Sequence, residues 1–139
     1  MVANEYILDA CALTAFIKEE VGDDVVKEIL KQAREGKTKV YMNKLNLFEV
    51  FYGIRRAEGL PRAKEVYDTI MKLPIQIIDG ISDDVFLEAS RIKASYRMSL
   101  ADSIALAQAS VMGAFIVTSD HHEFDIVEQN ESIKFAWIR

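Results

Sequence analysis

The chain has 139 residues, of which 50% are hydrophobic and 28% are charged. This balance is typical of a folded domain with a sizeable core, and it argues against intrinsic disorder. The net charge of −5 argues against strong non-specific binding to nucleic acid, which depends on Lys and Arg displacing counterions from phosphate. That objection weakens if several of the acids share one metal site, because bound divalent cations would neutralise part of their charge.

Cysteine and histidine are scarce, being limited to Cys11 and the pair His121-His122. A single cysteine cannot form a disulfide within the chain, which favours a reducing compartment, and a zinc site with nitrogen and sulfur ligands is poorly supplied. The N-terminal residues lack the basic and apolar regions of a signal peptide, and the longest apolar stretch, 104–117, is too short to span a bilayer. We therefore expect a soluble, cytoplasmic protein.

Short apolar runs alternate with segments that begin at capping residues. The runs predict strands at 6–8, 40–42, 75–78, 114–117 and 133–136. Capping residues predict helices at 10–18, 23–35, 44–58, 62–72, 83–96 and 100–112, with N-caps at Asp9, Asn43, Ser82 and Ser99. Gly36, Gly59 and Gly113 mark helix ends.

Strands that are apolar throughout and alternate with helices predict a three-layer α/β/α sandwich around a central, mostly parallel five-stranded sheet. The whole chain, 1–139, is expected to form one domain. Ligands of such folds bind outside the C-terminal ends of the strands, where the strand order reverses. Asp9 closes the first strand and Asp120 follows the fourth by two residues, so both are expected at this edge.

Glu49 lies in a segment, 45–54, that is apolar almost all round and is therefore expected to be deeply buried. An ion pair within the helix needs a base three or four residues away. Those positions hold Leu45, Asn46, Tyr52 and Gly53. Because a buried unpaired carboxylate costs several kcal/mol, Glu49 needs a metal, an arginine or backbone donors as its partner. The alternative is a narrow wet strip that Glu49 shares with Asn46 and Gly53.

Three further acids have both a structural and a functional interpretation. Asp9 stands at a strand-to-helix junction, the usual place of an N-cap. Asp102 follows Ser99 by three residues, the spacing of a capping box in which the acid reaches back to the N–H of the cap residue. Asp120 fits the cap of a short helix, with Glu123 completing the box. The residues themselves leave both interpretations open.

Other polar residues are weaker candidates. Asp125 is a fifth acid near Asp120, and His121 and His122 are expected in a loop, within reach of phosphate at most. Cys11 has no neighbouring histidine base, so a buried inert thiol is expected there. Six basic residues are candidates for an RNA path that the sequence cannot place on one face: Arg55, Arg56, Arg62, Lys64, Arg91 and Arg97.

Four short motifs in chain order resemble the PIN-domain family and, within it, the small VapC-type toxins. They are 7–9 ending at Asp9, 47–53 around Glu49, 101–107 with Asp102, and 117–120 ending at Asp120. The resemblance covers essentially the whole chain. It implies that Asp9, Glu49, Asp102 and Asp120 are the catalytic and metal-binding acids, supported by Thr118.

The same resemblance implies a metal-dependent endoribonuclease that hydrolyses RNA as the toxin of a toxin–antitoxin pair. A homodimer and a cognate VapB-like antitoxin are implied as partners. Family members usually carry a hydroxyl residue where this chain has Cys11, so a hydrogen bond that supports the acids is expected to be missing or altered. Cys11 is therefore left outside the expected site.

Four converging carboxylates would suit Mg²⁺ or Mn²⁺, which prefer oxygen ligands. We hypothesise that Asp9 and Asp102 bind the first ion most directly, and that Glu49 and Asp120 hold its waters or a second ion. Without metal the carboxylates would repel one another, which raises some of their pKa values.

Two other functions fit parts of this pattern. One is a non-catalytic interaction module with the same fold, whose acids only cap helices. The other is a receiver-like phospho-acceptor domain, which needs an acidic pair after the first strand and a lysine after a late strand. It is disfavoured because Glu5 precedes the first strand and no lysine follows the fourth. Cleavage of DNA instead of RNA stays open within the nuclease class.

Overall fold

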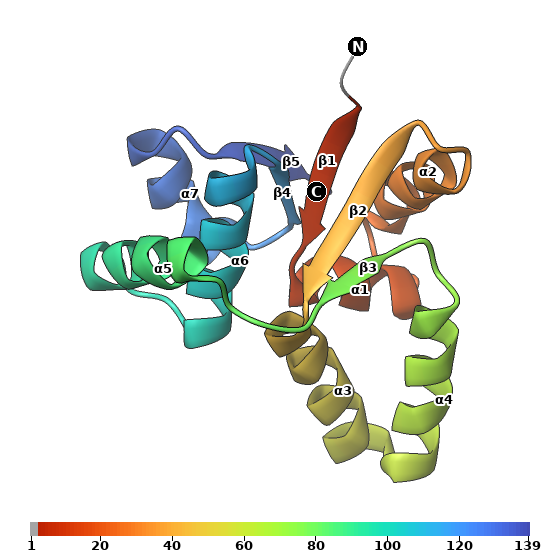
Figure 1. The fold of residues 1–139 in the computed structure, drawn as a ribbon. Coiled ribbons are helices and arrows are strands. Elements are labelled where there is room, and N and C mark those ends of the chain that lie inside the picture. The colour runs from red at the N-terminus through yellow and green to blue at the C-terminus, as the bar shows by residue number, and fades with distance from the viewer. Residues whose placement is uncertain (1–2) are drawn as a thin grey trace.

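The structure, a computed structural model, describes residues 3–139 and shows a central sheet with helices on both faces (Figure 1). The strands are β1 (Asn4–Leu8), β2 (Thr38–Asn43), β3 (Gln76–Ile78), β4 (Phe115–Thr118) and β5 (Lys134–Trp137). The helices are α1 (Ala10–Ile17), α2 (Asp23–Arg34), α3 (Lys44–Glu58), α4 (Leu60–Met71), α5 (Asp83–Ser95), α6 (Leu100–Met112) and α7 (His121–Asn130). The predicted alternation of strands and helices is confirmed.

Helices α4 and α7 depart most from the prediction. Helix α4 begins at Leu60, two residues earlier than expected, because Gly59 occupies the cap with a positive φ of 92° and Pro61 fits the first turn, where its missing N–H costs no hydrogen bond. Helix α7 runs for 10 residues from His121, so the expected loop at His121 and His122 is a helix start instead.

All strand pairs among the described residues are parallel, in the order β3-β2-β1-β4-β5. The order therefore reverses between β1 and β4, where Leu8 pairs with Val117. The N–H of Asp9 donates to the carbonyl of Val117 at 3.3 Å, which continues this pairing one residue beyond β1. The expected edge for a ligand is thus formed by the C-terminal ends of β1 and β4.

Successive residues of the central strands face opposite layers. Ile7 and Ile116 pack into a core with α5, α6 and α7, whereas Leu8 and Val117 pack into a core with α1, α2, α3 and α4. Both faces of the sheet are covered, as the apolar strands predicted. No helix within residues 3–139 is long and apolar enough to cross a membrane.

The expectation that α3 is deeply buried is wrong. Phe48 is 59% exposed and Tyr52 is 47% exposed. The buried residues of α3 are Asn46, Leu47, Val50 and Ile54. The physical reason is visible in Figure 1, where α3 and α4 form a hairpin that projects from the sheet and leaves one face of α3 in solvent.

Gly22 allows the end of the sheet to approach the turn between α1 and α2. Its φ is +100°, and a Cβ at this position would lie 2.7 Å from the carbonyl oxygen of Ile138. We expect Gly22→Ala to lower the free energy of unfolding by more than about 2 kcal/mol, measured by urea denaturation, since backbone strain of this kind alone costs about 1–2 kcal/mol. Gly36→Ala is the matched control, because Gly36 also has a positive φ of +77° but open space around it. Equal losses in the two variants would show that the close approach to Ile138 contributes nothing.

Candidate active site

Asp9 is buried at the end of β1, with 1% of its surface exposed. Its Oδ1 accepts a hydrogen bond from the N–H of Ala12 at 2.8 Å, so its predicted role as the N-cap of α1 is confirmed. Its Oδ2 is fully buried and has no hydrogen-bond partner within residues 3–139. Buried polar atoms are rarely left in this state, and a missing ion or water is one of the few physical reasons for it.

Burial raises the pKa of Asp9 from 3.8 to about 7. The nearby Thr118 hydroxyl and the Ala12 amide favour the charged form and act against this rise, whereas the carboxylates of Asp102 and Asp120 add to it. Mutual repulsion of the acids, which the sequence predicted, is therefore present but smaller than the effect of burial.

Asp102 lies in the first turn of α6, where it is the one residue between Ala101 and Ala109 that is not buried. The Ser99 hydroxyl accepts from the N–H of Asp102 at 3.1 Å. Within the described chain, no hydrogen bond runs back from the N–H of Ser99 to the Asp102 carboxylate, so the predicted capping box is only half formed. The carboxylate stays available for another partner.

The environment of Asp102 resembles that of Asp9. The pKa of Asp102 is raised from 3.8 to about 6, chiefly by burial, and the Ser99 hydroxyl acts against this rise. The charges of Asp120, Glu49 and Glu123 contribute smaller parts of it. Asp102 and Asp9 therefore both titrate close to neutrality in the absence of a cation.

Asp120 and Glu49 approach from two other elements. Asp120 caps α7, with its Oδ1 accepting from the N–H of Glu123 at 3.1 Å, and its own N–H donates to the Thr118 hydroxyl at 3.0 Å. Thr118 is fully buried at the end of β4, so it fixes the backbone at Asp120. Glu49 is half-buried on α3, where burial raises its pKa.

The four acids converge on one region. The pKa of the Cys11 thiol is raised to about 12, first by burial and then by the negative charges of the four acids. The charge of Asp9 has the largest effect, followed by those of Asp120, Asp102 and Glu49. The charge of Asp102 acts on Asp9, and the charges of Asp120 and Glu49 act on Asp102. The structure thus brings together four side chains that are distant in the sequence.

No three His, Cys, Asp or Glu side chains in residues 3–139 lie close enough to one another to form a ready metal site. The donors nevertheless suit a hard cation, because all are carboxylate oxygens and one of them, Oδ2 of Asp9, is buried without a partner. The carboxylates of Glu49, Asp102 and Asp120 are only half-buried, so their side chains have room to turn towards an ion.

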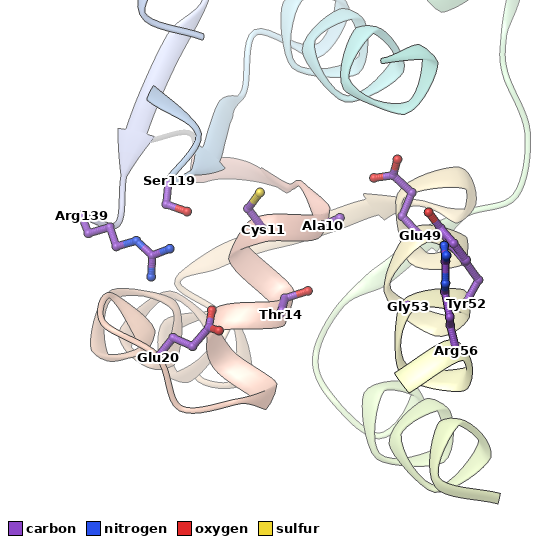
Figure 2. Close-up of a pocket in the computed structure, with 10 residues that line it drawn as sticks. All are labelled: Ala10, Cys11, Thr14, Glu20, Glu49, Tyr52, Gly53, Arg56, Ser119 and Arg139. Carbon is purple, nitrogen blue, oxygen red and sulfur yellow. The ribbon is translucent and has the colours of Figure 1, made fainter. Parts of the chain in front are cut away.

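A pocket of about 440 Å³ opens beside the acids, between α1 and α3 (Figure 2). The acid Glu49 and the thiol of Cys11 belong to its wall. The full lining is Ala10, Cys11, Thr14, Glu20, Glu49, Tyr52, Gly53, Arg56, Ser119 and Arg139. The pocket is therefore large enough for a small ligand beside Glu49 and beside Ala10 and Ser119, the chain neighbours of Asp9 and Asp120.

Residues 6–129 match the family model of the PIN domain. The chain belongs to the PIN-domain family. No curated protein matches the chain.

Solved structures share the fold of this PIN domain. The DNA-bound VapBC complex of Salmonella typhimurium matches with a TM-score of 0.76 at 15% identity, over 98% of this chain and 99% of that chain. VapBC2 of Rickettsia felis, bound to a DNA fragment from its promoter, matches with a TM-score of 0.73 at 15% identity, over 96% and 98%. The VapC20 toxin of Mycobacterium tuberculosis, which cleaves the sarcin–ricin loop, matches with a TM-score of 0.61 at 15% identity, over 88% and 94%.

One expectation about a neighbouring residue of this PIN domain is wrong, and the weaker candidate Asp125 has another partner. Cys11 is an exposed residue on the pocket wall instead of a buried one, but its thiol is desolvated enough to keep a raised pKa and stay protonated. The fifth acid whose charge acts on the site is Glu123, whereas Asp125 pairs with His121 at 2.7 Å. His121 also stacks on Trp137, with ring centroids 3.8 Å apart, so its ring serves the packing of α7.

Asn46 is a residue of this PIN domain that the sequence did not identify. It is fully buried, and its amide donates to the carbonyl of Ala101 at 3.1 Å, which ties α3 to the first turn of α6. Its Oδ1 is the second buried atom without a partner in the described residues, after Oδ2 of Asp9. The sequence feature that could have identified Asn46 is its amide in an otherwise apolar segment, one turn before Glu49. The sequence instead suggested that this amide lies on a solvent-exposed strip of the helix.

We expect Asn46→Ala to lower the free energy of unfolding by about 2 kcal/mol, because it removes the buried hydrogen bond between α3 and α6 and leaves a cavity in place of the amide. The displaced α6 would also misplace Asp102. Urea denaturation is the measurement, with Asn130→Ala on the exposed end of α7 as the control. Unchanged stability would contradict the bond between α3 and α6.

Proposed function

We propose that this protein is a metal-dependent endoribonuclease, the toxin of a VapC-type toxin–antitoxin pair, formed by one domain. The observation that carries the proposal is the buried Asp9 carboxylate, which has an unpartnered oxygen and lies among three other acids at the reversal of strand order. Membership of the PIN family and the shared fold with VapC toxins, one of them an RNA-cleaving toxin, support it. An RNA substrate of this kind implies a cytoplasmic location.

Asp9 and Asp102 are proposed to bind Mg²⁺ or Mn²⁺ most directly, while Glu49 and Asp120 hold waters of the ion or a second ion. When bound, the cation would lower the pKa of the attacking water and offset the negative charge that builds on the phosphate. The chain itself holds two of these acids in place. The N–H of Ala12 donates to the Asp9 carboxylate, and the backbone N–H of Asp120 donates to the Thr118 hydroxyl.

Three helices begin at this site. Asp9 caps α1, Ser99 caps α6, and Asp120 caps α7. The positive ends of their dipoles favour both ionised carboxylates and the phosphate of a substrate, each by a fraction of a kcal/mol to about 1 kcal/mol. This arrangement offsets part of the repulsion that an acidic protein exerts on RNA.

The partners implied by the resemblance are a VapB-like antitoxin and a second copy of the chain. Exposed large apolar side chains offer surface for protein contacts, since isolated monomers rarely expose many of them together. Examples are Leu87 on α5, and Leu100 and Val111 on α6. Co-expression with a short reading frame next to this gene should yield a complex that co-purifies.

The decisive experiment is cleavage of labelled RNA by the purified protein with Mg²⁺, with Mn²⁺ and with EDTA. We expect cleavage with either ion and none with EDTA. Equal cleavage in EDTA would refute the metal-dependent mechanism. A DNA strand of the same sequence tests the substrate class, and equal cleavage of DNA would replace endoribonuclease by a broader nuclease activity.

The non-catalytic interaction module is the second candidate, and the confirmed caps at Asp9 and Asp120 favour it. It leaves the buried Oδ2 of Asp9 without an explanation. If it holds, Mg²⁺ and Mn²⁺ do not shift the melting temperature, and no RNA is cleaved under any condition.

A further inference from the structure

Gly53 lies in the interior of α3, on the wall of the pocket next to Glu49. A glycine destabilises a helix interior relative to alanine, so its presence there needs a reason. Packing does not supply one, because a Cβ at Gly53 would meet no atom within 4 Å. The space above Gly53 is open, and it adjoins the proposed catalytic acids.

Tyr52, one ring of an exposed stacked pair, borders the same space. Tyr52 and Phe48 are one turn apart on α3, with ring centroids 5.5 Å apart and planes inclined by 23°. Tyr52 lines the pocket and follows Glu49 by three residues, which puts both on one side of the helix. Exposed aromatic rings in such positions are the platforms on which unpaired bases stack, with little preference for sequence.

Two arginines lie on opposite walls of the pocket. Figure 2 shows the Arg56 side chain running along α3 beside Tyr52 and Gly53, and Arg139 across the pocket from it. Arg139 is held through a hydrogen bond from its guanidinium to the carbonyl of Val21 at 2.8 Å. Each wall also carries an acid, Glu20 near Arg139 and Glu49 on α3, and Glu49 is one of the proposed metal ligands.

Two arginines outside the pocket are engaged in ion pairs. Arg91 pairs with Glu88 and Glu131, and Arg62 pairs with Glu65. Arg56 forms no ion pair within residues 3–139, although it is part of a chain with a net charge of −5. A free guanidinium within one turn of an exposed ring is the pairing that holds a phosphate next to a stacked base.

We infer that this pocket holds one nucleotide of a single-stranded RNA, next to the phosphate that is cleaved. Its base stacks on Tyr52, its sugar lies over Gly53, and its phosphates contact Arg56 and Arg139. The strand must be unpaired there, because a base within a duplex has both faces covered by its neighbours and cannot reach a ring. The inference rests on the proposed function and adds the residues that select the substrate.

The test uses the full chain with a single-stranded oligoribonucleotide and with the same sequence placed in a hairpin stem. Cleavage is measured with Mn²⁺, and binding of the uncut RNA is measured in EDTA by fluorescence anisotropy. The variants are Gly53→Leu, Tyr52→Leu, Tyr52→Phe and Arg56→Gln. Matched controls are Lys31→Gln, exposed on α2 and outside the pocket lining, and Phe86→Leu, an exposed ring on α5.

We expect Gly53→Leu and Tyr52→Leu to lower kcat/KM for the single strand about 10-fold or more, without a lower melting temperature. Tyr52→Phe retains the ring and should keep most of the rate. Arg56→Gln should weaken binding several-fold and reduce its salt dependence, because one phosphate contact is lost. The controls should behave as the parent, and the hairpin stem should be cut at least about 10-fold more slowly than the single strand.

The two hypotheses fail in different ways. If the parent cleaves RNA and Gly53→Leu and Tyr52→Leu cleave it equally well, the inferred nucleotide-binding pocket is wrong, but the proposed nuclease activity is retained. If no RNA is cleaved, the proposed nuclease activity is wrong. The RNA-binding data in EDTA then test the nucleotide-binding pocket by themselves. If Tyr52→Leu changes the oligomeric mass and leaves RNA binding unchanged, the ring pair is a protein contact and the inference is overturned.

Discussion

Replacing Asp9 by asparagine is expected to lower RNA cleavage by at least about 100-fold, the scale on which loss of a group that stabilises developing charge acts. Asparagine is nearly isosteric, and its carbonyl oxygen can still accept from the Ala12 N–H, so the cap of α1 should survive. The loss would therefore come from the missing negative charge. Circular dichroism would check the fold, and single-turnover cleavage with Mn²⁺ would measure the rate.

The same variant is expected to be more stable than the parent when metal is absent. A carboxyl whose pKa is raised on folding keeps its proton in the folded state at a pH where the unfolded chain has released it. The parent's free energy of unfolding therefore falls as pH rises from about 4 to about 7. Above pH 7 the folded protein has lost the whole of this contribution to its stability. The pKa change from 3.8 to about 7 corresponds to roughly 4 kcal/mol at 1.36 kcal/mol per unit.

Urea denaturation in EDTA at pH 5 and pH 8 measures this effect. Asp9→Asn should remove most of the parent's fall in stability between these pH values. Asp68→Asn, on the exposed side of α4, makes the same charge change outside the site and should behave as the parent. A variant less stable than the parent at pH 8 would show that the Asp9 charge is compensated without metal.

The second large effect is expected in the pH dependence of metal binding. Asp9 and Asp102, with pKa values of about 7 and about 6, must both release their protons to an ion. Between pH 8 and pH 5 the ionised fraction falls roughly 100-fold for Asp9 and roughly 10-fold for Asp102. The apparent affinity for Mn²⁺ should therefore fall about 1000-fold over this range.

Isothermal titration calorimetry in two buffers of different ionisation enthalpy would report both the affinity and the number of protons released. Asp102→Asn should bind more weakly at pH 8 and show a shallower dependence on pH, since only the Asp9 proton is left to release. Affinity that stays constant from pH 8 to pH 5 would contradict the participation of these two carboxyls. Glu49 is a poor choice for this comparison because its smaller burial gives a weaker signature.

Local features were predictable because their causes lie within a few residues. Asn43, Ser82 and Ser99 each accept from an N–H two or three positions ahead, so the caps and the helix starts follow from short stretches of chain. Apolar runs between such helices indicated the strands. The alternation of the two indicated a parallel sheet, whose reversal point places Asp9 and Asp120 at one edge.

The sequence by itself therefore determined the strands, the helix starts and the edge at which a ligand would bind, because hydrogen-bond spacing and apolar periodicity act over a few residues. Only the tertiary structure decided which acid is buried and which is half-exposed. An apolar helix such as α3 can cover a core or project from it, and Glu49 and Tyr52 depend on that choice. Likewise, the charge of Glu123, not that of Asp125, acts on Asp102 because the orientation of α7 depends on contacts with distant parts of the chain. One of these contacts is the stacking of His121 on Trp137.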